Sequence, residues 1–94
     1  AEGGRVTAAL QTIEQAIALE ASNAEYLAHQ ARLLTLVRRE ADARIAADTA
    51  ASLGSDDPMV LDTIGCVYAR LSDHDAALPL FEAAVAGQPD GINY

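Results

Sequence analysis

Cysteine, aromatic residues and long apolar stretches are all scarce in this sequence. The chain of 94 residues has one cysteine, no tryptophan and 4% aromatic residues. A single cysteine excludes an internal disulfide, and no apolar stretch reaches the roughly 20 residues that a membrane-spanning helix needs. The chain also lacks an initiator methionine and a signal-like start. We therefore expect a soluble, cytoplasmic fragment of a longer protein, with no membrane partner.

Positive charge is scarce as well. The formal net charge is −8, and the longest basic cluster is the pair Arg38-Arg39. Nucleic acids and anionic membranes would repel such a chain, so we expect no nucleic-acid partner. Apolar residues make up 51% of the sequence. Most of them are alanine and leucine with charged residues between them, which favours helix over strand and predicts an all-α fold.

Small and apolar residues recur when the chain is shifted by 34 residues, the period of a common two-helix repeat. Two stripes of aligned positions result, one for each helix of the repeat. From the last repeat to the first, they are Ala77/Ala43/Ala9, Phe81/Ala47/Ile13, Ala84/Ala50/Ala16 and Val85/Ala51/Ile17, and in the other helix Leu61/Leu27, Gly65/Ala31 and Tyr68/Leu34.

These positions resemble the signature of the tetratricopeptide repeat (TPR) family over nearly the whole chain. The resemblance implies an all-α fold, a right-handed α-solenoid of antiparallel helix pairs with about two and a half repeats. Residues 1–94 would then be one domain fragment: 6–23 the second helix of a truncated repeat, 24–57 and 58–91 two repeats, and 92–94 the start of another. The signature residues are Leu61, Ile64, Gly65, Tyr68, Ala77, Phe81, Ala84 and Pro89.

Capping residues divide the chain into helices in the same way. Asn23 and Asp57 are suitable N-caps, Pro58 follows in the first helical position, and Ser72 or Asp73 can cap the last helix. We predict helices over about 6–21, 24–37, 41–53, 58–71 and 74–87.

Two features depart from the family pattern, and one segment is expected to turn. The turn at Arg38-Arg39 lacks the usual glycine, and Pro79 lies inside a predicted helix, where it removes one hydrogen bond. Gly3-Gly4-Arg5 aligns with this turn and with the turn at Leu71-Ser72-Asp73, so we expect a turn there too.

Gly65 and Cys66 stand side by side in the predicted helix 58–71, and we interpret both as packing residues. A glycine inside a helix costs roughly 1 kcal/mol relative to alanine, which close approach of Phe81 would offset. Cys66 lies in mid-helix, and neither His29 nor His74 is spaced to act as its base. Two histidines and one cysteine in separate elements give no zinc spacing. We expect no catalytic, cofactor-binding or metal-binding residues.

The TPR resemblance implies that the first helix of each pair lines a concave groove that binds a protein or peptide partner. Chaperone-binding members hold a terminal carboxylate with lysines and asparagines that are absent here. Arg32 and Arg70 have the geometry to bind a carboxylate or phosphate instead; the alternative is that both are solvated surface residues. The expected groove residues are Glu25, Ala28, His29, Arg32, Thr35, Leu36, Met59, Asp62, Thr63, Cys66, Ala69 and Arg70.

Three classes of function follow from the sequence. The main one is a non-catalytic interaction scaffold that binds a protein or peptide. The second is an accessory region of a multidomain enzyme, because the segments Asp62-Thr63-Ile64-Gly65, Asp73-His74, Pro79-Leu80-Phe81 and Gly91-Ile92-Asn93-Tyr94 resemble repeats that precede a sulfotransferase domain in some bacterial proteins. In that case the catalytic residues lie beyond Tyr94. The third is end-to-end self-association, since an uncapped repeat leaves an apolar face at each end.

Overall fold

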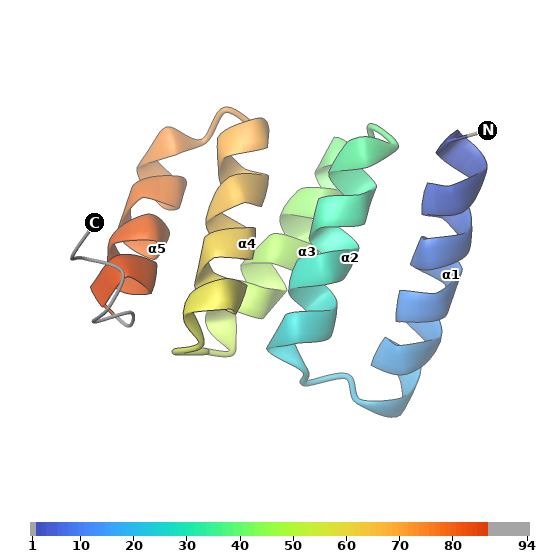
Figure 1. The fold of residues 1–94 in the computed structure, drawn as a ribbon, viewed down its shortest axis with the longest axis horizontal. Coiled ribbons are helices and arrows are strands. Elements are labelled where there is room, and N and C mark those ends of the chain that lie inside the picture. Colours follow the sequence, from blue (N-terminus) through green and yellow to red (C-terminus); the bar gives the residue numbers. More distant parts are fainter. Residues whose placement is uncertain (1, 87–94) are drawn as a thin grey trace.

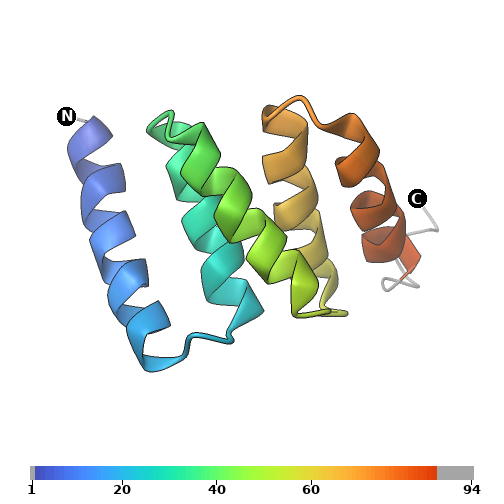
Figure 2. The ribbon, with the colours of Figure 1, turned by 180° about the vertical axis from the view of Figure 1, so that it is seen from behind.

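The computed structural model describes residues 2–86, which form five α-helices and no strand (Figure 1). The expectation of an all-α fold is confirmed for this range. Consecutive helices alternate in direction, so α2 and α4 run the same way, and α3 crosses behind them (Figures 1 and 2). Pro89 and the expected repeat start at 92–94 lie outside the described residues. The helices are α1 (Glu2–Leu19), α2 (Ala24–Leu36), α3 (Glu40–Ser52), α4 (Pro58–Arg70) and α5 (His74–Ala86).

Three side chains begin helices as the sequence predicts. The Asn23 side chain accepts a hydrogen bond from the backbone N–H of Tyr26, and Asp57 accepts one from Met59, with Pro58 in the first turn of α4. Asp73, rather than Ser72, caps α5 by accepting from the N–H of Ala76. These bonds satisfy amide groups that have no partner inside the helix. Helices α2 to α5 therefore lie within about one residue of their predicted bounds.

Helix α1 differs from the prediction at both ends. It begins at Glu2, so Gly3, Gly4 and Arg5 are helical, and the predicted turn at these residues was wrong. That prediction came from alignment with turns that join two packed helices, and within residues 2–86 no helix is joined to the start of α1 in that way. Glycine in a helix costs about 1 kcal/mol but does not forbid it. The helix also ends at Leu19, two residues early.

The two turns at Arg38 and Ser72 have the same geometry, although neither contains glycine. Both residues adopt a left-handed backbone, with φ of 62° and 64°. In each turn the next amide donates to a carbonyl five residues back: Arg39 to Leu34 and Asp73 to Tyr68. This is the Schellman pattern, which ends a helix sharply. The missing glycine at Arg38-Arg39 has not opened the turn.

The core lies between the helices and is made largely of small side chains. Helix α2 packs against α1, α3 and α4, and α4 packs against α3 and α5 as well. The signature residues Ile64, Gly65, Tyr68, Ala77 and Ala84 are buried, while Leu61 and Phe81 are half-buried. The other core residues include a stripe of four alanines on α3, together with residues of α2 and α4: Ala43, Ala46, Ala47 and Ala50, Leu27, Ala28, Ala31, Leu33 and Leu34, and Val60 and Val67.

Candidate functional site

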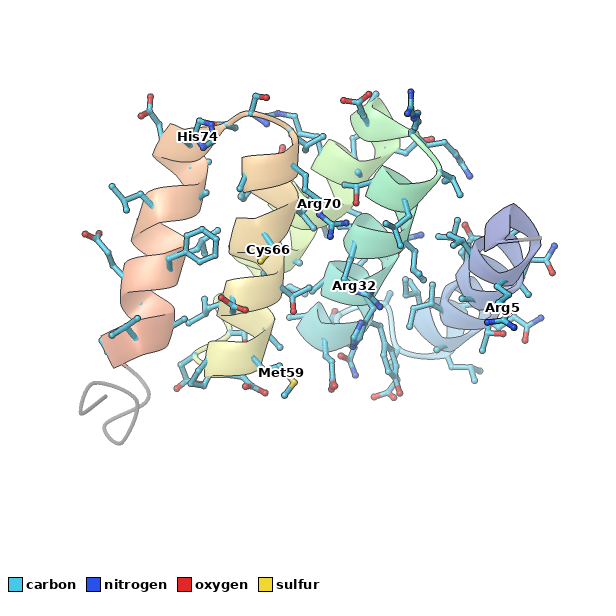
Figure 3. The ribbon with its side chains drawn as sticks, turned by 45° about the horizontal axis from the view of Figure 1, so that its top comes forward. Arg5, Arg32, Met59, Cys66, Arg70 and His74 are labelled. Atoms are coloured by element: carbon cyan, nitrogen blue, oxygen red, sulfur yellow. The ribbon has the colours of Figure 1, made fainter. Side chains whose placement is uncertain are left out.

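The surface shared by α2 and α4 carries most of the residues predicted to bind a partner. The two helices pack against each other and point the same way, so their outward side chains form one surface. We call this surface the α2/α4 face. Its members are Glu25, His29, Arg32 and Thr35 on α2 and Met59, Asp62, Cys66 and Arg70 on α4, of which Met59, Cys66, Arg32 and Arg70 are labelled in Figure 3.

Not all of the predicted groove residues are accessible. Leu36 is exposed, and Thr63 and Ala69 are half-buried beside the face. Ala28 is only 1% exposed and belongs to the core, so its assignment to an open surface was wrong. The alignment places Ala28 level with the exposed Asp62. The burial differs because α4 packs on α2, whereas within residues 2–86 no later first helix packs on α4.

A chain of hydrogen bonds joins the two helices at one end of the α2/α4 face. The Arg70 guanidinium donates from Nη1 to the Thr35 hydroxyl, with a separation of 3.3 Å. The same hydroxyl donates to the backbone carbonyl of Arg32, 2.6 Å away. The Arg70 head group therefore lies on α2, next to the helical turn that carries Arg32. Of the two arginines singled out from the sequence, Arg70 thus reaches the α2 backbone at the turn of Arg32.

Neither of these arginines has an acidic partner among the described residues. The ion pairs in that part of the chain join Arg39 to Asp42 and Arg44 to Asp73. The only side-chain partner of Arg70 there is the neutral Thr35. In a chain with a net charge of −8, these two arginines, which have no carboxylate partner within residues 2–86, are available to an anionic group from outside.

Cys66 sits between Asp62 and Arg70 on the exposed side of α4. Partial burial and the negative charge of Asp62 raise the pKa of the Cys66 thiol, and Arg70 lowers it only in part. A reactive cysteine needs the opposite, a lowered pKa that yields thiolate at neutral pH. The environment of Cys66 therefore argues against nucleophilic chemistry at this position.

Gly65 packs under the ring of Phe81, as the sequence predicts. A Cβ atom added at Gly65 would lie 2.8 Å from Phe81 Cε1 and 3.0 Å from Cδ1. Real Cβ atoms do not approach other carbons so closely, because carbon contacts are optimal near 3.5 to 4.0 Å. Glycine at this position lets α4 and α5 meet.

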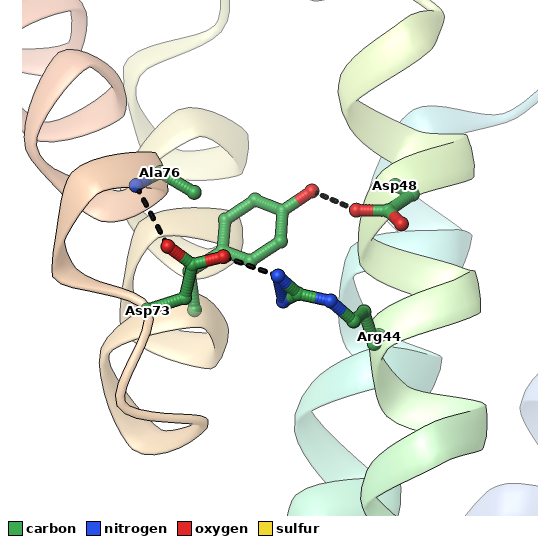
Figure 4. Close-up of polar contacts among 5 residues, drawn as sticks. Arg44, Asp48, Asp73 and Ala76 are labelled. Atoms are coloured by element: carbon green, nitrogen blue, oxygen red, sulfur yellow. Dashed lines mark hydrogen bonds and ion pairs between the residues drawn. The ribbon is translucent and has the colours of Figure 1, made fainter.

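A polar cluster on the other side of α4 was not anticipated from the sequence (Figure 4). The Tyr68 hydroxyl donates to Asp48 at 2.5 Å, and the Arg44 guanidinium lies over the Tyr68 ring, 5.7 Å from its centroid. Arg44 also forms an ion pair with Asp73, which caps α5. Burial and the bond to Asp48 raise the pKa of Tyr68. The sequence holds one indication of this cluster. Arg44 and Asp48 are four residues apart, so they lie on the same side of α3, next to its alanine stripe.

The surface is hollowed at the end of the α2/α4 face opposite Arg70. This hollow lies between α4 and α5 and extends from the face toward the outer side of α5. It is lined by Pro58, Met59, Asp62, Phe81, Ala84 and Val85.

The described residues contain no group of three or more His, Cys, Asp and Glu side chains that could hold a metal ion. Within the same residues, none of the helices has the length and apolar character needed to cross a membrane. A scan against models of protein families finds no family that matches the chain, and a search of curated proteins finds no relative.

Proposed function

We propose that this chain is a non-catalytic interaction module, a TPR-like right-handed solenoid that binds a protein or peptide partner across the α2/α4 face. The observation that carries the proposal is the bond between Arg70 and Thr35. It joins the two parallel helices and holds Arg70, which has no acidic partner within residues 2–86, next to the turn of α2 that carries Arg32. The surface therefore offers guanidinium donors to an acidic group of a partner.

The repetition of structure at equal spacing supports the solenoid part of the proposal. Arg38 and Ser72 are aligned by the 34-residue shift, and both end a helix with the same left-handed turn. Helix α2 packs on α3 as α4 packs on α5, and α4 also contacts both helices of the preceding pair. In such arrays each unit buries its apolar side against its neighbours, which leaves the other side free for ligands.

The test is a charge reversal on the α2/α4 face. Random 12-residue peptides displayed on phage are selected against the protein, and selected peptides are titrated by fluorescence anisotropy. We expect Arg32→Glu/Arg70→Glu to abolish binding while helical circular dichroism is retained. The matched control is Arg5→Glu/Arg39→Glu, which changes the net charge equally but lies on α1 and in the α2–α3 turn. Equal loss in the control, or no loss in the first variant, would contradict the assignment of the face.

Self-association is a second candidate, favoured by exposed apolar side chains at the start of α4 and along α5. Met59 is 68% exposed, Leu78 59% and Val85 52%. Apolar side chains gathered on one side can mark a protein contact. Sedimentation velocity at increasing concentration tests this: we expect association that Leu78→Ser/Val85→Ser removes. A strict monomer at the highest concentration would exclude it.

A further inference from the structure

The charges of the α2/α4 face are arranged in the same order on both helices. Along α2 the order is Glu25, His29, Arg32, and along α4 it is Asp62, Cys66, Arg70. Because α2 and α4 run in the same direction (Figure 1), the acid of each helix lies nearer to one end of the face and its arginine nearer to the other. The face is therefore acidic at one end and basic at the other.

The separation of the charges can be obtained from helix geometry. Glu25 and Arg32 are seven residues apart, and Asp62 and Arg70 are eight apart. At a rise of 1.5 Å per residue these spacings correspond to about 10 to 12 Å along the helices. That distance is too long for an ion pair within either helix, and no ion pair of the described residues involves these four side chains. None of these four charges is therefore neutralised by an ion pair within residues 2–86.

The helix dipole accounts for only part of this order. It favours acids in the first turn and bases in the last turn, and its effect fades beyond them. Glu25 and Arg70 do lie in such turns. Asp62 lies beyond the first turn of α4, and Arg32 lies before the last turn of α2. The helix dipole therefore does not explain the position of these two charges.

We propose that the α2/α4 face binds an extended peptide segment that carries a basic and an acidic side chain four residues apart, the basic one over Glu25 and Asp62 and the acidic one over Arg32 and Arg70. This inference rests on the proposed function and specifies its ligand. In an extended chain, residues four apart point to the same side and are separated by about 13 Å. This distance matches the separation of the charges on the face, whereas a helical ligand would need a spacing of seven or eight residues.

Two end-capped synthetic peptides of equal composition test the spacing. One carries lysine and glutamate four residues apart among alanine and serine, and the other carries them adjacent. Anisotropy titration at low salt should give at least about fivefold tighter binding for the first peptide, the size expected for a few exposed ion pairs. Arg32→Gln/Arg70→Gln should remove this advantage. The same variant should not change the affinity for a peptide in which glutamine replaces the glutamate. The four combinations of protein and peptide form a double-mutant cycle across the interface.

The phage-selected 12-residue peptides separate this inference from the proposed function. Enrichment of opposite charges four residues apart supports both. A second outcome is that the selected peptides need Arg32 and Arg70 but carry no regular spacing of opposite charges, or carry them seven or eight residues apart. This would overturn the inference and leave the proposed function in place. Failure to select any peptide that depends on the α2/α4 face would overturn both.

Discussion

Replacing Gly65 with alanine should lower stability, although alanine is the better helix former. In an open helix the change would stabilise by about 1 kcal/mol. Here the new Cβ would lie 2.8 Å from Cε1, 3.0 Å from Cδ1 and 3.2 Å from Cζ of Phe81. The ring must move out of its rotamer or α5 must shift, and such overpacking costs about 1 to 3 kcal/mol. The net expectation is a loss of about 1 kcal/mol in the free energy of unfolding.

Urea denaturation followed by circular dichroism measures this change, and thermal melting should show a decrease of about 4 to 8 °C per kcal/mol. The cause is isolated by repeating the substitution in a Phe81→Leu background. With the ring gone, Gly65→Ala should become stabilising by about 1 kcal/mol, which gives a coupling energy near 2 kcal/mol. If Gly65→Ala stabilises the otherwise unchanged protein by the full helix-propensity amount, Phe81 moves freely and our account of this contact is wrong.

Three further predictions concern the turns, the tyrosine and the cysteine. Arg38→Gly and Ser72→Gly should each stabilise by up to about 1 kcal/mol in urea denaturation, because glycine adopts the left-handed backbone without strain; a loss in both would contradict the turn geometry. The pKa of Tyr68 is raised in the folded protein, so its contribution is present below the ordinary tyrosine pKa near 10 and is lost as pH rises beyond it. The free energy of unfolding should therefore fall more steeply above pH 10 than in Tyr68→Phe, and identical slopes would count against the bond to Asp48. Cys66 should react with iodoacetamide at pH 7 more slowly than a free cysteine peptide, because its thiol pKa is raised; faster reaction would indicate an activated thiol.

Helix positions were predictable because local signals and the repeat agree. Asn23, Asp57 and Pro58 begin helices through side-chain and backbone chemistry that the sequence displays directly. The contact of Gly65 with Phe81 was predictable for the same reason, since a glycine in mid-helix needs a close neighbour and the spacing supplies one. Helix α1 was misjudged at its start because its limits depend on what precedes it in space, and alignment with internal turns carries no information on that.

The candidate site was predictable in part. Helical spacing identified the exposed stripes of α2 and α4, including Arg32 and Arg70. It failed at Ala28, because burial there depends on a helix that comes 30 residues later in the sequence. Helical spacing also did not predict the hydrogen bond between Tyr68 and Asp48. The position of a tyrosine on an apolar stripe does not show which group its hydroxyl will contact. Tertiary partners of long polar side chains are set by packing angles, which periodicity does not determine.

The side-chain hydrogen bonds and the ion pair that join the two helix pairs lie at one end of α4. Tyr68, Arg70 and Asp73 lie within or just after its last two turns, and they bond to Asp48, Thr35 and Arg44 of the preceding pair. The opposite end, with Met59 and Asp62, adjoins a hollow. Arg70 is thus already ordered before a ligand binds, and an ordered side chain loses less entropy on binding. The basic end of the α2/α4 face is therefore the preorganised end, and it should contribute more of the affinity than the acidic end.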